Sequence, residues 1–298
     1  MIGLHKAKRI LSKLESSASG VHAVLLYGPE GSGKGLMATS LIEHWLGNQR
    51  AIDAFRRGAN PDVHVIEPMG ASRIIRRHQI TPPTPPNEPP VAHLVDFLRT
   101  APLYSNNKVA KIVDAERMND TATNALLKPL EEPASYAKLI LTTTSISQIR
   151  QTILSRCLVV ACELPSDEEL KKAFPEATPE FITMAGASPG QLSRIAGNPE
   201  FYQKVSQFAR QLVNADASQL LKLSDGFKSL AEELDSSTKI GARAANTKVV
   251  ELVATMIAQQ SPERADIIQA LSDAHRRIIG NAASNLVFDA VLARFLIK

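Results

Sequence analysis

The sequence has very little cysteine: only Cys157 and Cys162 occur among its 298 residues. Two thiols exclude a disulfide framework and any four-cysteine zinc site made by this chain alone, so both are expected to be small core residues. No segment approaches the roughly 20 consecutive apolar residues of a membrane span. The start also lacks the apolar run and cleavage site of a secretory signal, so we expect a cytoplasmic globular protein with no membrane contact.

Sequence signals for a metal site, for a general base and for the recognition of nucleic-acid bases are also missing. The seven histidines show no His-x-x-x-His spacing or acid pairing typical of zinc or of a general base. No aromatic residues are interleaved with basic ones for stacking on bases, and a net charge of +4 is too mild to demonstrate nucleic-acid binding. The cluster Arg73, Arg76, Arg77 and His78 fits either a solvated charged segment or a contact with DNA phosphates.

The first half of the chain alternates short apolar runs with helical patterns. Such alternation predicts an α/β fold, with a parallel sheet covered by helices on both faces. The expected strands are "HAVLLYG" ending at Gly28, Val63–Ile66, Val109–Asp114, Leu139–Thr144 and Cys157–Cys162. Helical spacing follows the first strand in "KGLMATSLIEHWL" and recurs over Val91–Ala101.

Two segments of the chain depart from this alternation. "TPPTPPNEPP", Thr81–Pro90, holds six prolines and cannot form helix or central strand. This composition predicts an exposed, semi-rigid connector or, alternatively, a proline-rich ligand for a partner. After Pro165 only helical patterns follow, with apolar stripes that bury against one another or against another chain. The stripes are Phe201, Val205, Phe208 and Leu212; Val249, Leu252, Val253 and Met256; Ile268, Leu271, Ala274 and Ile278; then Val287, Ala290 and Val291.

The loop "GPEGSGKG", Gly28–Gly35, has the composition of a phosphate-binding loop between a strand and a helix. Gly28, Gly31 and Gly33 would let the backbone N–H groups around Ser32 approach phosphate oxygens, and Lys34 would reach the β- and γ-phosphates. A glycine-rich turn with an accidental lysine is the alternative. Gly35 stands where a Ser or Thr hydroxyl would ligate magnesium, so nucleotide binding can survive while metal placement is impaired.

A P-loop ATPase also needs a carboxylate at the end of a neighbouring strand, commonly followed by a catalytic glutamate. "KIVDAERMN" supplies Asp114, followed by Ala115 instead of glutamate. On an extended strand end Glu116 is expected to point to the opposite side. A surface acid or a partner for Arg117 is then the favoured interpretation of Glu116 over catalysis.

Two further motifs could contact phosphate. Thr142–Thr144 end the next strand, where a hydroxyl could sense a γ-phosphate, although threonine is also a common strand residue. "LSRC" places Arg156 in a loop before the following strand. Its planar guanidinium would suit a phosphate on an adjoining subunit, whereas an isolated surface arginine is usually solvated.

Taken together, "GPEGSGKG", "NPDVHVIEP", "VAKIVDAERMNDTATNALLKPLEEP", "LILTTTS", "LSRC" and "GASPGQLSR" resemble one family. The chain resembles the delta-prime subunits of the bacterial DNA polymerase III clamp loader. The similarity is specific from about Leu25 to Arg194, above all in "NALLKPLEEP" followed by "LSRC". Beyond Glu200 only the all-helical character and the length agree.

The resemblance implies a AAA+ P-loop domain over residues 1–163, a small helical lid over 164–200 and an all-α collar that joins subunits in a ring over 201–298. It implies gamma/tau and delta subunits as partners, with the sliding clamp and primer-template DNA reached through the assembly. ATP or ADP is the implied nucleotide, with magnesium left open. By the same resemblance Arg156 acts in trans, Thr143 or Thr144 is the first sensor and Arg194 the second.

The departures from the family pattern matter equally. Relatives often carry a four-cysteine zinc module before the segment matched by "NPDVHVIEP", and "WLGNQRAIDAFRRGA" has no cysteine, so no zinc is expected. Pro129 falls inside an expected helix, which should kink or end there. The family includes members with degraded ATP sites, which fits Gly35 and Ala115.

Three hypotheses follow from these motifs. The leading one is a clamp-loader subunit of the DNA polymerase III holoenzyme that supplies Arg156 and hydrolyses little ATP itself. The second is a catalytically active AAA+ ATPase, either a gamma/tau-type motor, a branch-migration-type helicase or a helicase loader, favoured by Lys34 and Asp114. The third is a regulatory nucleotide-binding module outside replication.

Overall fold

The computed structural model describes residues 20–296 except 71 and 281, together with Leu4, Ala7, Arg9, Ile10 and Ser12. The chain falls into two compact units, each described here by itself. The first comprises Met1–Pro175 with Ser188–Gly190, and the second comprises Glu176–Ala187 with Gln191–Lys298. The three-domain division at residues 163 and 200 stays a prediction.

The first unit is built on a five-stranded sheet. Its strands are β1 (Ala23–Tyr27), β2 (Val63–Ile66), β3 (Lys108–Ile112), β4 (Ala137–Thr143) and β5 (Leu158–Ala161). Every pairing is parallel, in the order β2-β3-β4-β1-β5. This confirms the predicted α/β class, and each predicted strand overlaps an observed one.

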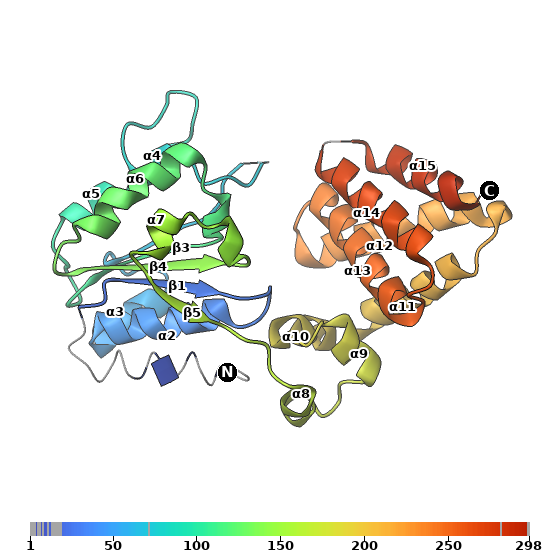
Figure 1. Cartoon of the computed structure of the whole chain (residues 1–298), viewed down its shortest axis with the longest axis horizontal. Coiled ribbons are helices and arrows are strands. Elements are labelled where there is room, and N and C mark those ends of the chain that lie inside the picture. The colour runs from blue at the N-terminus through green and yellow to red at the C-terminus, as the bar shows by residue number, and fades with distance from the viewer. Residues whose placement is uncertain are drawn as a thin grey trace. The chain divides into compact units, whose positions relative to one another are not determined.

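Helices cover both faces of the sheet (Figure 1). The helices of this unit are α2 (Lys34–Leu46), α3 (Gln49–Arg56), α4 (Arg77–Ile80), α5 (Leu94–Arg99), α6 (Asp120–Glu131), α7 (Gln151–Leu154) and α8 (Asp167–Ala173), with short 3₁₀ turns η1 (Ala115–Arg117) and η2 (Ile146–Gln148). In Figure 1, α2 and α3 lie on one side of the sheet and α4, α5, α6 and α7 on the other.

Strand β1 shows why this sheet needs two helical layers. Because successive side chains point to opposite faces, Ala23 and Leu25 enter the core under α6, whereas Val24 and Leu26 enter the core under α2. All four are at most 1 % exposed. A strand buried on both faces must be apolar throughout, and the sequence of β1 has this composition.

A buried carboxylate anchors the turn that precedes β3. Asp62 accepts the backbone N–H groups of Leu103 (2.7 Å), Tyr104 (2.6 Å) and Ser105 (2.9 Å). Burial alone would raise the pKa of Asp62, but these hydrogen bonds to the ionised form outweigh it and hold the pKa below its usual value of 3.8. Sequence reasoning did not single out this residue.

The proline-rich segment Thr81–Pro90 forms neither helix nor strand, as predicted. The basic residues before it are not simply a solvated segment, because Arg77 and His78 belong to the short helix α4, most of which is buried. His78 and Gln79 of α4 are each 4 % exposed and Ile80 is fully buried. The apolar residues interleaved with the arginines therefore turn this segment into part of the core.

The second unit is helical in every described element. It contains α9 (Pro179–Met184), the C-terminal part of α10 (Pro189–Gly197), α11 (Pro199–Val213), α12 (Leu220–Thr238), α13 (Ala242–Gln260), α14 (Ala265–Ile279) and α15 (Ser284–Leu296), with the 3₁₀ turn η3 (Ala217–Gln219). The predicted stripes on α11 and α13 are buried within this unit. On α14, Leu271, Ala274 and Ile278 of the predicted stripe are buried together with Ile267, whereas Ile268, also predicted for the stripe, is half-buried.

Aromatic packing holds α11, α12 and α15 together. The Phe227 ring packs edge-on against Phe208 at 4.8 Å and stacks on Phe288 at 4.7 Å. Gly226 makes this approach feasible, because a Cβ there would lie 2.3 Å from the Phe208 ring. A glycine inside a helix is unfavourable by about 1 kcal/mol, and the close ring contact explains its presence.

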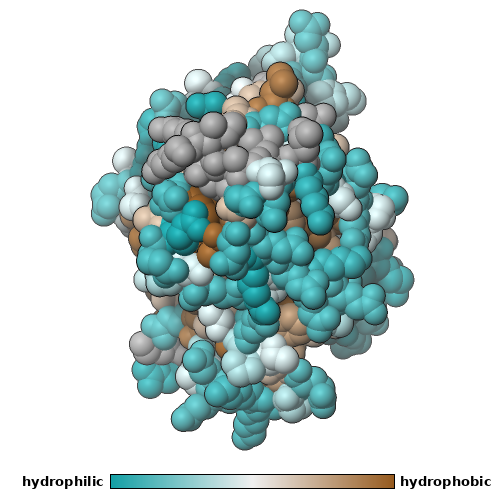
Figure 2. Space-filling view, turned by 90° about the vertical axis from the view of Figure 1, so that its right-hand side faces the viewer, coloured by the Kyte–Doolittle hydropathy of each residue, from teal (hydrophilic) through white to brown (hydrophobic). Residues whose placement is uncertain are grey.

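Surface hydrophobicity is dispersed on the face shown in Figure 2, where hydrophobic side chains are scattered among many hydrophilic ones. Scattered apolar side chains are normal for a protein surface. Within the described residues no helix is both long and apolar enough to span a membrane.

Replacing Asp62 tests the anchored turn. Since the pKa of Asp62 is depressed in the folded state, its contribution is complete above the unfolded value of about 3.8 and is lost as pH falls through the folded value. We expect Asp62→Asn to lower the free energy of unfolding at pH 7 by about 1–3 kcal/mol. The wild type should also lose more stability than the variant between pH 7 and pH 3, as measured by urea unfolding. Asp96→Asn, at an exposed carboxylate, is the control, and equal effects of the two changes would contradict this role.

Candidate functional site

The loop after β1 has the shape that its glycines predict. Gly31 and Gly33 adopt left-handed backbone conformations, with φ of 73° and 93°, and Lys34 begins α2. At Gly28 the backbone passes so close to β5 that a Cβ would lie 2.2 Å from the Cys162 carbonyl oxygen. The glycine-rich segment therefore forms a loop leading into a helix N-terminus, the arrangement that binds phosphate.

Lys34 is folded back onto this loop. Its ammonium group donates to the carbonyl oxygens of Gly28 (2.6 Å) and Pro29 (2.7 Å). Burial lowers the pKa of Lys34, and the nearby acids, Glu116 and Asp114 among them, partly offset that shift. A cation held among carbonyls and carboxylates is placed to bind an anion in the loop.

Ser32 and Gly35 differ in what they offer a ligand. The Ser32 hydroxyl oxygen is buried and has no hydrogen-bond partner, which fits a loop built for an additional polar group. Gly35 is exposed, with no atom within 4 Å of the place a Cβ would occupy. The loop thus fits phosphate, while the side chain that would hold magnesium is missing although there is space for one.

The prediction that Glu116 points away from the loop is wrong. Asp114 has a left-handed conformation (φ 52°), and the 3₁₀ turn η1 follows it, so the backbone is not extended there. This turn brings Glu116 within electrostatic range of Asp114 and Lys34. Extended alternation does not apply past Ile112, where β3 ends.

The two acids have opposite pKa shifts. Burial, followed by repulsion from Glu116, raises the pKa of Asp114, which Arg73 at 3.8 Å partly offsets. Burial would also raise the pKa of Glu116, but hydrogen bonds from Thr144 outweigh it and the pKa is lowered. Glu116 is therefore the better stabilised anion of the pair.

The threonines at the end of β4 have separate roles. Thr143 is fully buried, and its hydroxyl donates to the carbonyl of Ser145 at 3.1 Å. Thr144 is exposed and donates to Glu116 through its backbone N–H (3.1 Å) and its hydroxyl (2.7 Å). Both predicted sensor residues are linked to the acidic pair: Thr144 through these two hydrogen bonds, and Thr143 through a weaker side-chain interaction that also lowers the pKa of Glu116.

Arg156 lies at the other edge of the sheet. Parallel pairing aligns Val24 with Leu158 and Tyr27 with Ala161, so Arg156 precedes the start of β5 whereas the glycine loop follows the end of β1. Four residues of strand separate the two edges by about 13 Å. The structure gathers Lys34, Asp114, Glu116 and Thr144 at one edge and leaves Arg156 at the opposite one.

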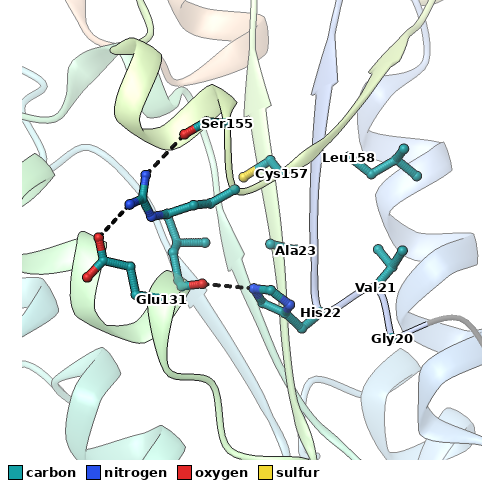
Figure 3. A pocket seen from close by; sticks show the side chains of 10 residues that line it. Gly20, Val21, His22, Ala23, Glu131, Ser155, Cys157 and Leu158 are labelled. Atoms are coloured by element: carbon teal, nitrogen blue, oxygen red, sulfur yellow. Dashed lines mark hydrogen bonds and ion pairs between the residues drawn. The ribbon is translucent and has the colours of Figure 1, made fainter.

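Arg156 lines a cavity of about 690 Å³, together with Glu131 and Ser155, which Figure 3 labels. Its guanidinium donates to the Thr152 carbonyl (2.8 Å) and the Ser155 hydroxyl (3.0 Å), and pairs with Glu131 at 2.7 Å. Sequence reasoning quoted Glu131 within a motif without assigning it a role. An acidic residue at the end of the helix before β4 was the only signal for it.

The remaining predicted residues are placed as follows. Arg194 is exposed on α10 in the second unit, and its role as a sensor stays a prediction. Cys162 is buried, Cys157 is half-buried, and burial raises their pKa values to about 11 and about 12. Pro129 lies inside α6, which ends two residues later at Glu131, in line with the expected early end of the helix.

No described group of three or more His, Cys, Asp or Glu side chains is arranged to hold a metal ion. The expectation of no zinc stays a prediction, and so does the use of magnesium. The carboxylates of Glu116, Asp114 and Glu30 all lie close enough to Lys34 to raise its pKa.

The strand order, the phosphate-binding loop after β1 and the acids after β3 define a AAA+ type P-loop protein. The fold agrees with the crystal structure of a DNA polymerase III gamma subunit-related protein from Thermotoga maritima. That structure has a TM-score of 0.60 at 21% identity and covers 98% of both chains. At this identity the likeness shows the fold alone.

Sequence relatives identify the family more narrowly. A family model described as DNA polymerase III, delta subunit matches residues 3–165, more than half of the chain. DNA polymerase III subunit delta′ of Pseudomonas aeruginosa is 34% identical over 247 residues, covering 76% of this chain and 69% of that protein. The Bacillus subtilis subunit delta′ is 32% identical over 145 residues, covering 46% and 40%. The chain belongs to the delta-prime family of DNA polymerase III subunits.

Alanine at two glycines of the loop should have opposite effects on stability. Gly28→Ala places a Cβ against the Cys162 carbonyl, and we expect it to lower the free energy of unfolding by about 2 kcal/mol or more. The Cβ added by Gly35→Ala enters open space in a helix, so this change should raise the free energy of unfolding by up to about 1 kcal/mol. Urea unfolding of both variants measures this. A stable Gly28→Ala protein would show that the loop does not approach β5 as described.

Proposed function

We propose that this chain is a clamp-loader subunit that completes the active site of a neighbouring subunit with Arg156 and hydrolyses little ATP itself. In the cytoplasm it would assemble with gamma/tau and delta subunits, and the assembly would load the sliding clamp onto primed DNA. Membership of the delta-prime family supports the general role.

One observation carries the proposal: Arg156 lies at the edge of the sheet opposite the chain's own phosphate-binding loop. It is too far from that loop to contact a nucleotide bound there. An arginine that serves phosphate chemistry from this position must face a nucleotide on another subunit. An arginine supplied in trans accelerates hydrolysis at the site that it completes by roughly 10³- to 10⁵-fold.

ATP or ADP is the nucleotide that this chain's own loop would hold. The backbone N–H groups from Gly31 to Gly33 and the ammonium of Lys34 would bind its phosphates, and Arg194 would face it as a second sensor. When bound with magnesium, such a nucleotide supplies the phosphoryl group for hydrolysis. Here Gly35 and Ala115 lack the metal-binding hydroxyl and the glutamate of an active site, so binding without efficient hydrolysis is favoured.

A second candidate function is supported by Glu116. Since Glu116 lies near Asp114 and Lys34 instead of pointing away, it could replace the missing glutamate and make the chain an ATPase in its own right. Magnesium-dependent hydrolysis by the purified chain alone, abolished by Lys34→Ala, would favour this alternative.

Removing Arg156 tests the leading proposal in a reconstituted loader with clamp and primed DNA. We expect Arg156→Ala to slow hydrolysis at the site that Arg156 faces by roughly 10³-fold or more. The total ATP turnover of the loader should therefore fall by the contribution of that one site. Lys34→Ala should leave turnover close to that of the wild type. Arg150→Ala, at another exposed arginine that pairs with Asp120, is the matched control. Unchanged turnover of a fully assembled Arg156→Ala loader would refute the proposal.

Restoring a hydroxyl at Gly35 tests the account of the chain's own loop. Because there is open space at this position, Gly35→Ser should fold normally and tighten nucleotide binding severalfold in magnesium relative to EDTA. Gly35→Ala, which also adds a Cβ and raises helix propensity, is the control without a metal ligand. Fluorescent ATP analogue titrations measure both variants, and an identical magnesium response of the two would count against a missing metal ligand.

A further inference from the structure

Glu131 is the acidic partner of Arg156. The carboxylate oxygen Oε1 lies 2.7 Å from a terminal nitrogen of the guanidinium, and the side chains are 48% and 33% exposed. The guanidinium also donates to the Ser155 hydroxyl at 3.0 Å, so it lies between Glu131 and Ser155, the two residues labelled at the ends of the dashed lines in Figure 3. The ion pair therefore joins the end of α6 to the turn that carries Arg156.

Helix stability does not account for an acid at this position. Glu131 is the last residue of α6, where the negative end of the helix dipole makes a carboxylate unfavourable. Pro129, two residues earlier, removes one backbone donor from the same turn. The partner that compensates this charge is Arg156, so the contact with Arg156 explains the residue better than the helix does.

Buried packing and hydrogen bonds hold both partners of the Glu131–Arg156 ion pair in place. Leu130, beside Glu131, is 1% exposed, and its carbonyl is hydrogen-bonded to the His22 ring at 2.9 Å. On the other side, the guanidinium donates to the Thr152 carbonyl at the end of α7, which also accepts from the Ser155 hydroxyl. Glu131 thus holds one terminal nitrogen of the guanidinium, and the turn that carries Arg156 holds the other.

We propose that Glu131 is a positioning residue that holds the guanidinium of Arg156 in the orientation needed for a phosphate on the neighbouring subunit. This inference rests on the proposed function of Arg156. An unrestrained arginine side chain has much conformational entropy to lose on binding. A guanidinium already oriented stabilises the developing charge without that reorganisation.

The experiment compares five loaders assembled with wild-type chain, Glu131→Gln, Glu132→Gln, Arg156→Ala and the Glu131→Gln/Arg156→Ala double variant. Glutamine keeps the shape of Glu131 and removes its charge. Glu132 is the adjacent exposed acid, which makes Glu132→Gln a matched control. ATP turnover with clamp and primed DNA is measured as kcat and KM, alongside assembly and urea unfolding of each chain.

We expect Glu131→Gln to lower kcat at the affected site by about two- to fivefold, the range typical of an exposed ion pair. KM for ATP, assembly and unfolding should stay unchanged, and Glu132→Gln should match the wild type. With Arg156 already replaced, Glu131→Gln should have no further effect, because a residue that acts through Arg156 has nothing left to position.

The outcomes separate this inference from the function on which it rests. If Arg156→Ala has no effect, the proposed function fails and the inference fails with it. If Arg156→Ala lowers turnover but Glu131→Gln does not, only the positioning role is refuted. A rise in kcat would show that Glu131 competes with the phosphate, and a further loss in the double variant would show that it acts independently. Either result would also overturn the proposal.

Discussion

All five strands of the sheet run in the same direction, and the placement of each candidate residue follows from that constraint. Parallel strands put their carboxyl ends together, so the glycine loop after β1, the acids after β3 and the threonines after β4 meet at one edge. The residues that precede strands collect at the other edge, where Arg156 and the end of α6 lie. One helix links the two edges, because α6 begins just after the acids and ends at Glu131.

The edge that carries the phosphate-binding loop combines a preserved shape with rearranged side chains. Close backbone contact with β5 at Gly28 and the buried ammonium of Lys34 maintain the loop. The acid is displaced by one residue relative to the usual pair, and Thr144 holds it in its ionised form. In the proposed function such a site binds a nucleotide without efficient hydrolysis, while Arg156 of this chain, at the opposite edge, serves the neighbouring subunit.

Sequence patterns were reliable where local chemistry decides the conformation. The apolar run before Gly28 and the helical spacing after it correspond closely to β1 and α2, because a doubly buried strand and an amphipathic helix leave strong periodic signals. They failed past Ile112, where a left-handed Asp114 and a 3₁₀ turn replaced the extended backbone assumed for Glu116. They also favoured Ile268 over Ile267, since adjacent apolar residues leave the phase of a helical stripe ambiguous.

By itself the sequence determined the α/β class, the phosphate-binding loop, the helical second half and the family, because these depend on residue type, spacing and local periodicity. Only the tertiary structure decided which residues meet. It brought Glu116 to Thr144, Glu131 to Arg156 and Asp62 to the turn at Leu103–Ser105. Each of these contacts joins segments separated by 25 residues or more along the chain. Such pairings depend on strand order and backbone turns, which no local pattern encodes.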